Sequence, residues 1–250
     1  MAVWVLTGFM GCGKTSIGRA AAKMLGVGGM PPKEAPESFT GSQKESSPAK
    51  APDAFPNTLL FLDLDEEIVR RCGRSIPEIF AAEGEEGFRR IEMDTLATLL
   101  QGAGVPHGGR ATRGTEAGGP SALADGGVSE ANSPRGNDPK PELLIALGGG
   151  TLMNEECREL VKRNAKCIYL RAKVETLAEN LRTDDVAGRP MLSGVNLEAP
   201  ADAPDSLESR IASMMALRGP IYEKAADIIL DIDGLTYEDA ARQILKSFFQ

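Results

Sequence analysis

Residues 8–15 read Gly8-Phe9-Met10-Gly11-Cys12-Gly13-Lys14-Thr15, which fits the P-loop pattern G-x-x-x-x-G-K-[ST]. An apolar and β-branched run, 3–7, precedes this loop, and a helical pattern, 14–25, follows it. In this setting the backbone N–H groups turn toward an anion, and the helix N-terminus adds a partial positive charge. The pattern predicts a phosphate site in which Lys14 reaches the β- and γ-phosphates and the hydroxyl of Thr15 holds Mg²⁺.

Composition narrows the classes of protein that the chain can represent. The chain has 250 residues and a net charge of −8, which fits one or two globular domains and disfavours a nucleic-acid or anionic-membrane partner. It contains no apolar run long enough to span a bilayer, and its single histidine, His107, excludes a His-pair metal site. The four cysteines are scattered, which suits a reducing compartment. The first predicted strand begins at residue 3, so we expect a cytoplasmic protein, or a plastid stromal one if the chain is a trimmed form.

Residues 28–57 are rich in Pro, Ser, Lys, Glu and Ala, and residues 102–140 are rich in Gly, Ala, Ser, Pro and Asn. Neither segment shows hydrophobic periodicity, which predicts two low-complexity insertions. The remainder predicts one α/β domain: a doubly wound, five-stranded parallel sheet flanked by helices. The predicted strands cover residues 3–7, 58–64, 143–147, 167–171 and 227–231. The predicted helices cover residues 14–25, 75–82, 86–100, 154–163, 174–182, 207–217 and 237–249.

Two carboxylates follow the second predicted strand in the segment Phe61-Leu62-Asp63-Leu64-Asp65. Side chains at i and i+2 of a strand share a side, so Asp63 and Asp65 should lie together at the ligand-binding edge of the sheet. One carboxylate would serve Mg²⁺ and the other would receive a proton from a hydroxyl group. The alternative is a strand-end turn with solvated acids.

Arginines and glycines supply the other candidate residues. Arg89 and Arg218 suit an anionic substrate group, although an exposed helix face and compensation of a helix dipole are the respective alternatives. Gly148, Gly149 and Gly150 follow the third strand and would bring bare backbone close to a ligand rather than form a flexible turn. Residues 181–192 predict a lid in which Arg189 neutralises charge on a transferred phosphoryl group, or else an ordinary surface loop.

Together these motifs resemble the shikimate kinase family of P-loop kinases. The resemblance rests on GFMGCGKT (8–15), FLDLD (61–65), GRSIPEIF (73–80), GEEGFRRIE (84–92), LGGG (147–150), RPML (189–192) and LRGPIY (217–222). It implies transfer of the γ-phosphoryl group of ATP to the 3-hydroxyl of shikimate, a step toward chorismate and the aromatic amino acids, by a protein that is expected to be a monomer.

The resemblance also implies a role for each candidate residue. The ATP phosphates would contact Gly11, Cys12, Gly13, Lys14, Thr15 and Ser16. Mg²⁺ would be held by Thr15, with Asp63 nearby through water. Asp65 would bind the acceptor hydroxyls and act as the base, and Arg182 would lie against adenine while Arg189 serves as the lid arginine. The shikimate carboxylate would bind Arg89 and Arg218, with Gly148, Gly149 and Gly150 against the ring.

Two other hypotheses stay open at this point. One is a different P-loop small-molecule kinase, similar to gluconate kinase. The other is a non-catalytic module that has kept the kinase fold. The residue that such modules usually lose is a P-loop lysine, a carboxylate or a substrate arginine, and all of these are present here.

Overall fold

A computed structural model describes residues 2–25, 59–102, 142–183, 199–201 and 203–248. Five strands, all parallel, form one sheet in the order β2-β3-β1-β4-β5. They are β1 (Val3–Thr7), β2 (Leu59–Asp63), β3 (Glu142–Ala146), β4 (Lys166–Arg171) and β5 (Ile228–Asp231). The predicted doubly wound sheet is therefore confirmed.

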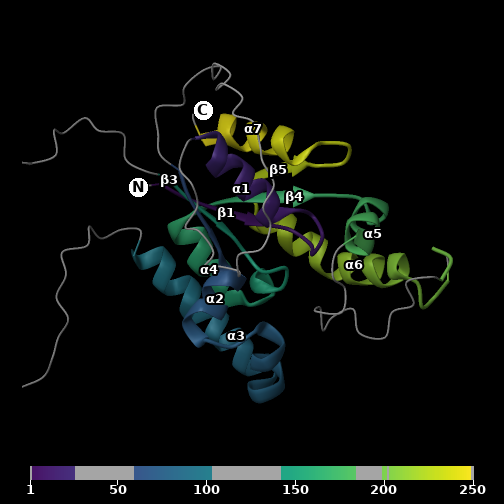
Figure 1. The fold of residues 1–250 in the computed structure, drawn as a ribbon, viewed down its shortest axis with the longest axis horizontal. Coiled ribbons are helices and arrows are strands. Elements are labelled where there is room, and N and C mark those ends of the chain that lie inside the picture. The colour runs from purple at the N-terminus through teal and green to yellow at the C-terminus, as the bar shows by residue number, and fades with distance from the viewer. Residues whose placement is uncertain (1, 26–58, 103–141, 184–198, 202, 249–250) are drawn as a thin grey trace, which may run out of the picture.

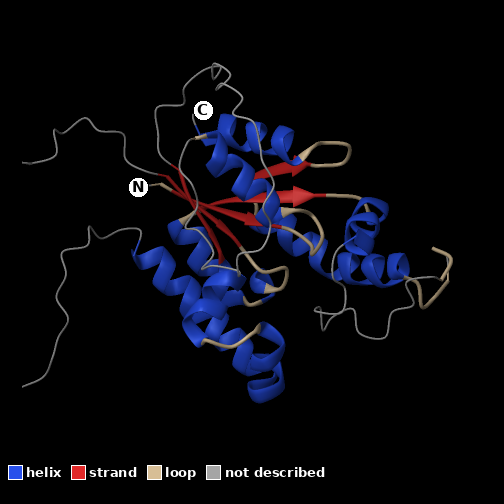
Figure 2. Ribbon diagram, viewed as in Figure 1, coloured by secondary structure: helices blue, strands red, loops and turns tan. Residues whose placement is uncertain are grey.

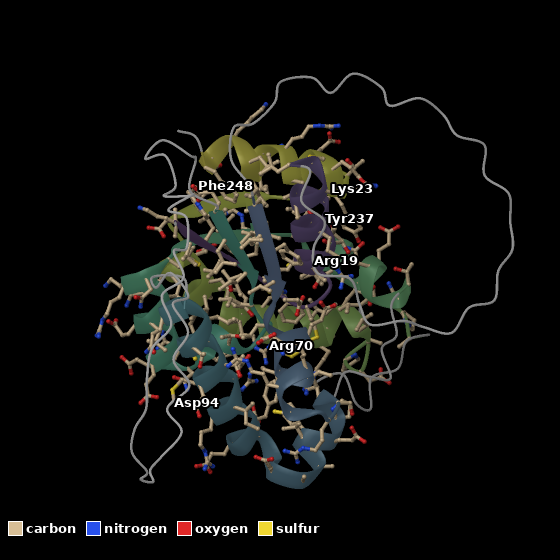
Figure 3. The ribbon with its side chains drawn as sticks, turned by 60° about the vertical axis from the view of Figure 1, so that its left-hand side comes forward. Arg19, Lys23, Arg70, Asp94, Tyr237 and Phe248 are labelled. Atoms are coloured by element: carbon tan, nitrogen blue, oxygen red, sulfur yellow. The ribbon has the colours of Figure 1, made fainter. Side chains whose placement is uncertain are left out.

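Helices cover both faces of this sheet (Figure 1, Figure 2). They are α1 (Lys14–Met24), α2 (Leu64–Cys72), α3 (Ile76–Gly102), α4 (Glu155–Asn164), α5 (Val174–Thr183), α6 (Leu207–Ala225) and α7 (Tyr237–Phe248), with a 3-10 turn η1 (Thr151–Met153). On one side α1 packs against α7, and on the other side lie α2, α3 and α4 (Figure 1). Tyr237 and Phe248 mark the opposite ends of α7 (Figure 3). The ring of Phe248 stacks on that of Trp4, with 4.5 Å between the ring centroids.

The central strand β1 shows why the sheet is buried on both faces. Its side chains alternate between two hydrophobic cores, with Val3 and Val5 in one and Trp4 and Leu6 in the other. A continuous apolar strand of this kind is typical of a parallel sheet between two helical layers. The carboxyl ends of β1, β2 and β3 are neighbours, so the segments that follow them meet at one edge.

The strand predicted over 58–64 differs from the structure at its end. Residue 58 lies outside the described residues, and β2 stops at Asp63, after which α2 begins at Leu64. Helix α2 was not expected from the sequence. Asp63 is its N-cap: Oδ1 accepts hydrogen bonds from the backbone N–H groups of Asp65 (3.0 Å) and Glu66 (3.3 Å). Asp65 therefore lies in the first turn of a helix, and the i, i+2 strand argument for it was wrong.

Two predicted helix boundaries also change. The helices expected over 75–82 and 86–100 form α3, whose helical geometry breaks only at Gly84 (φ 70°, ψ −176°). The helix expected to end at residue 217 continues through Pro220 to Ala225. Proline removes one backbone hydrogen bond from a helix, but the fully buried Tyr222 anchors the last turns of α6. Arg218 consequently lies inside the helix, so compensation of a helix C-terminus does not explain it.

Several predictions concern residues outside the described part of the chain. These are the insertion 28–57, nearly all of the insertion 102–140, and the lid from residue 184 onward with Arg189. No helix in the described ranges has the length and apolarity that crossing a membrane requires.

Candidate active site

A cavity of about 400 Å³ opens at the carboxyl edge of the sheet, where the segments after β1, β2 and β3 meet. It brings together most of the residues that the sequence singled out. Its lining includes Gly11, Gly13, Lys14, Thr15, Ser16, Asp63, Asp65, Arg89, Gly148, Gly149, Gly150 and Arg218. Ligands of open α/β sheets bind at this edge, so the cavity is the candidate active site.

The P-loop forms one wall of the cavity. Gly13 caps α1 in the left-handed conformation (φ 80°), which a side chain would disfavour, and a Cβ there would lie 2.8 Å from the ring of Tyr237. Nζ of Lys14 donates to the carbonyl oxygens of Gly8 (2.9 Å) and Phe9 (3.0 Å), so its charge lies over the loop. The amide of Asn180 on α5 donates to the carbonyl of Gly11 at 2.8 Å and holds the loop in place.

Cys12 does not line the cavity, although it belongs to the P-loop. Its side chain is fully buried in the core beneath the loop, with Sγ 3.6 Å from Nζ of Lys14. This placement fits a small residue that fills a tight loop, and only backbone atoms of Cys12 can face a phosphate group.

Thr15 and Asp63 form the next part of the site. Oγ1 of Thr15 donates to Oδ2 of Asp63 at 2.5 Å, while the other carboxylate oxygen of Asp63 caps α2. A hydroxyl and a carboxylate oxygen at the end of a P-loop are the hard ligands that Mg²⁺ prefers, together with phosphate and water. Among the residues that the structure describes, no group of three His, Cys, Asp or Glu could hold a metal alone. A hydroxyl and one carboxylate leave the other positions around the ion to phosphate and water, so this donor set suits a metal shared with a nucleotide.

Asp65 lines the cavity together with Lys14 of the P-loop and with Arg89, and both cations are close enough to affect its charge. Its side chain is exposed to the cavity, but protein atoms surround it on the other sides. Burial, Asp63 and Glu92 raise the pKa of its carboxyl group to about 6, against the opposing effect of Lys14 and Arg89. A carboxylate with such a pKa is mostly ionised at pH 7 and is well suited to accept a proton.

An ion pair with Glu92, which was not predicted from the sequence, fixes Arg89 in the wall of the cavity. Its guanidinium donates to Glu92 at 2.7 Å, and Glu92, which is 1% exposed, also accepts a 2.5 Å hydrogen bond from the hydroxyl of Thr151. A Cβ at Gly150 would lie 2.8 Å from Cζ of Arg89, so this position must lack a side chain for the guanidinium to stay. The i, i+3 spacing of Arg89 and Glu92 on a helix was the signal in the sequence.

Arg218 is the second arginine that lines the cavity. It projects from α6 with its guanidinium 5.9 Å from the centre of the Phe9 ring, a cation–π contact with the P-loop. Arg89 and Arg218 thus reach the same cavity from α3 and α6. Two guanidinium groups that reach one cavity can bind an anionic ligand such as a carboxylate.

Two lining residues were not predicted from the sequence, and two predicted site residues are not found in the cavity. Asn180 and Tyr237 line the cavity because α5 and the start of α7 pack against the P-loop. Arg182, which was expected to face adenine, pairs with Glu208 at 2.7 Å and is not among the lining residues. Arg189 lies outside the described residues.

A P-loop, a hydroxyl–carboxylate pair, and a further carboxylate and two arginines in the same cavity define a P-loop phosphotransferase. The sequence profile of the family described as "Shikimate kinase" matches residues 57–108 and 138–248. The chain therefore belongs to the shikimate kinase family.

Individual relatives agree with this family. The chain is 30% identical over 245 residues to the shikimate kinase of Chlorobium chlorochromatii, covering 96% of this chain and 88% of the relative. It is 28% identical over 247 residues to that of Chlorobium limicola, covering 96% and 85%. Among solved structures, a shikimate kinase from Acinetobacter baumannii in complex with shikimate has a TM-score of 0.61 at 24% identity, covering 100% of this chain and 93% of that one, which shows a shared fold.

Proposed function

We propose that the protein transfers the γ-phosphoryl group of ATP to the 3-hydroxyl group of shikimate, giving ADP and 3-phosphoshikimate. The observation that carries the proposal is that one cavity is lined by the P-loop, by the carboxylate of Asp65 and by the two arginines Arg89 and Arg218. Membership of the shikimate kinase family supports the choice of acceptor.

On the phosphate side, the backbone of the P-loop and Lys14 would bind the β- and γ-phosphates of ATP. Thr15 and Asp63 would hold Mg²⁺, Asp63 through water. When bound, the ion neutralises charge on the phosphate oxygens. The hydrogen bond from the Thr15 hydroxyl to Asp63 supports this role, because it keeps the two oxygen ligands next to each other.

On the acceptor side, Arg89 and Arg218 would bind the carboxylate of shikimate. The bare backbone of Gly148, Gly149 and Gly150 would lie against the ring. Asp65 would then orient the reacting hydroxyl and take its proton as the oxygen attacks phosphorus. Because Glu92 holds the guanidinium of Arg89, the anion site is largely pre-organised.

The remaining roles are also part of the proposal. Arg189 would close over the phosphates as the lid arginine, and Arg182 would leave Glu208 to reach the base of ATP. Residues 28–57 and 102–140 would be insertions into one domain. A cytoplasmic monomer without nucleic-acid or membrane partners stays a prediction.

The proposal is tested by ADP release from Mg²⁺-ATP with shikimate, shikimate methyl ester or gluconate as acceptor. We expect turnover with shikimate, much weaker turnover with the ester because the arginines lose their ionic partner, and none with gluconate. Faster turnover with gluconate would favour the alternative kinase. No turnover with any acceptor, from folded protein that binds ATP, would favour the non-catalytic module.

A further inference from the structure

Tyr222 is a buried residue next to the cavity that has no role in the mechanism above. It lies one helical turn after Arg218 on α6, and its side chain is 0% exposed. Its hydroxyl donates a hydrogen bond to the carbonyl oxygen of Gly149, 73 positions earlier in the chain. Burial raises the pKa of the phenol above its usual value, against the opposing charge of Arg218, so the hydroxyl stays protonated and remains a donor.

Gly149 is the point where the acceptor side touches the phosphate side. A Cβ built on it would lie 3.4 Å from the backbone N of Met10 and 3.8 Å from the carbonyl oxygen of Gly8. The middle glycine is therefore packed on the P-loop from one side and held by Tyr222 from the other. A shift of Gly149 would change the distance between an acceptor and the phosphates.

The ring of Tyr222 is fixed as well as its hydroxyl. It packs against the ring of Tyr169 on β4 at 5.3 Å, with an interplanar angle of 38°. Tyr169 is also buried, with 1% of its surface exposed. Within the part of the chain that the structure describes, its hydroxyl makes no hydrogen bond to a residue of the cavity. The two tyrosines thus share an environment, and they differ in the hydrogen bond to Gly149.

We propose that Tyr222 is a positioning residue for the acceptor: through Gly149 it holds the glycine segment at a fixed place between Arg218 and the P-loop. The inference rests on the proposed function. Helix α6 would then have two functions, because Arg218 and Tyr222 are four residues apart on the same face of the helix. Arg218 supplies a cation to the cavity, and Tyr222 supplies the hydroxyl donor that holds Gly149. Tyr222 itself touches neither ATP nor the acceptor in this account.

The test compares Tyr222→Phe with Tyr169→Phe, which removes the same atom from the neighbouring ring. For Tyr222→Phe we expect the KM for shikimate to rise on the order of 10-fold, since a buried hydrogen bond is lost and a carbonyl is left without its donor. The KM for ATP should change less than twofold, and Tyr169→Phe should match the wild type. Equal effects of both variants, or equal changes in both KM values, would overturn the inference.

Hydrogen exchange of the peptide around residues 148–152 provides a second measurement that needs no turnover. The inference expects faster exchange there in Tyr222→Phe and wild-type exchange in Tyr169→Phe. An unchanged rate in Tyr222→Phe would contradict it, as would loosening of the entire fold rather than this segment. If the wild type shows no shikimate-dependent turnover, the proposed function fails, and the exchange rates still decide whether Tyr222 holds Gly149.

Discussion

The hydroxyl of Thr15 lies 2.5 Å from Oδ2 of Asp63, although 48 positions separate the two residues in the chain. One belongs to the first turn of α1 and the other is the N-cap of α2. The two oxygens of this carboxylate thus have different partners: Oδ2 accepts a hydrogen bond from Thr15 of the P-loop, and Oδ1 caps the N-terminus of α2. This arrangement predicts that metal binding and helix stability can be separated by mutation.

Asp63→Asn should weaken Mg²⁺ binding but leave the fold nearly as stable, because asparagine also caps helices well. We expect a loss on the order of 10- to 100-fold in apparent Mg²⁺ affinity, measured by titrating the metal at saturating ATP. Asp63→Ala is the control: it should show the same metal defect and lose about 1 kcal/mol of stability besides. Unchanged Mg²⁺ dependence in both variants would remove Asp63 from the metal site.

The raised pKa of Asp65 predicts the pH dependence of turnover. A base works in its ionised form, so kcat/KM for shikimate should be level above pH 7 and fall about tenfold per unit below about pH 6. The residual activity of Asp65→Asn should lack this inflection. A wild-type profile that stays level down to pH 5 would exclude Asp65 as the base.

Ionised Asp65 should reduce the stability of the fold at neutral and alkaline pH. Its pKa is about 6 in the folded protein, above the usual 3.8, so the folded state holds the proton more tightly than the unfolded state does. Stability that comes from the bound proton is present below pH 4 and is lost as the pH rises through 6. Asp65→Asn stays neutral and should therefore be more stable than the wild type at pH 8, by ~1 kcal/mol after allowance for exposure to cavity water. Thermal melts at pH 8 and pH 4.5 check this: the difference should shrink at the lower pH, and a variant less stable at pH 8 would refute it.

Gly150→Ala should damage the acceptor side alone. The new Cβ would lie 2.8 Å from Cζ of Arg89 and would push the guanidinium away from Glu92. We expect the KM for shikimate to rise about tenfold or more, with the KM for ATP within twofold of the wild type, since one charged hydrogen-bond partner is misplaced. Gly219→Ala is a suitable control, because its Cβ would meet only Cε of Met215 at 4.0 Å. If both variants bind shikimate as the wild type does, the anion site does not depend on the close approach at Gly150.

The sequence predicted the parts of the site that follow a strand directly. The P-loop, the Asp63–Asp65 segment and Gly148–Gly150 were expected at one edge, and the structure places all three around one cavity. The reason is topological, since parallel strands end at the same edge. The local structure of Asp65 differs from the prediction, because Asp65 lies in the first turn of α2 and not at the end of a strand.

Other contributors could not be predicted, because tertiary packing alone brings them to the site. Asn180 supports Gly11 from α5, Tyr237 rests against Gly13 at the start of α7, and Tyr222 reaches Gly149 from beyond a proline. None of these contacts follows from spacing in the sequence. Helix α6 continues past Pro220 and buries Tyr222 in its last turns, which a local propensity argument does not predict.

The most direct test of the central claim is the identity of the phosphorylated product. Wild-type protein incubated with Mg²⁺-ATP and shikimate should form one molecule of 3-phosphoshikimate for each ADP, as followed by ³¹P NMR and mass spectrometry. Asp65→Asn should form almost none. ADP that appears with free phosphate at a rate independent of shikimate would contradict the assignment of this cavity as a shikimate kinase active site.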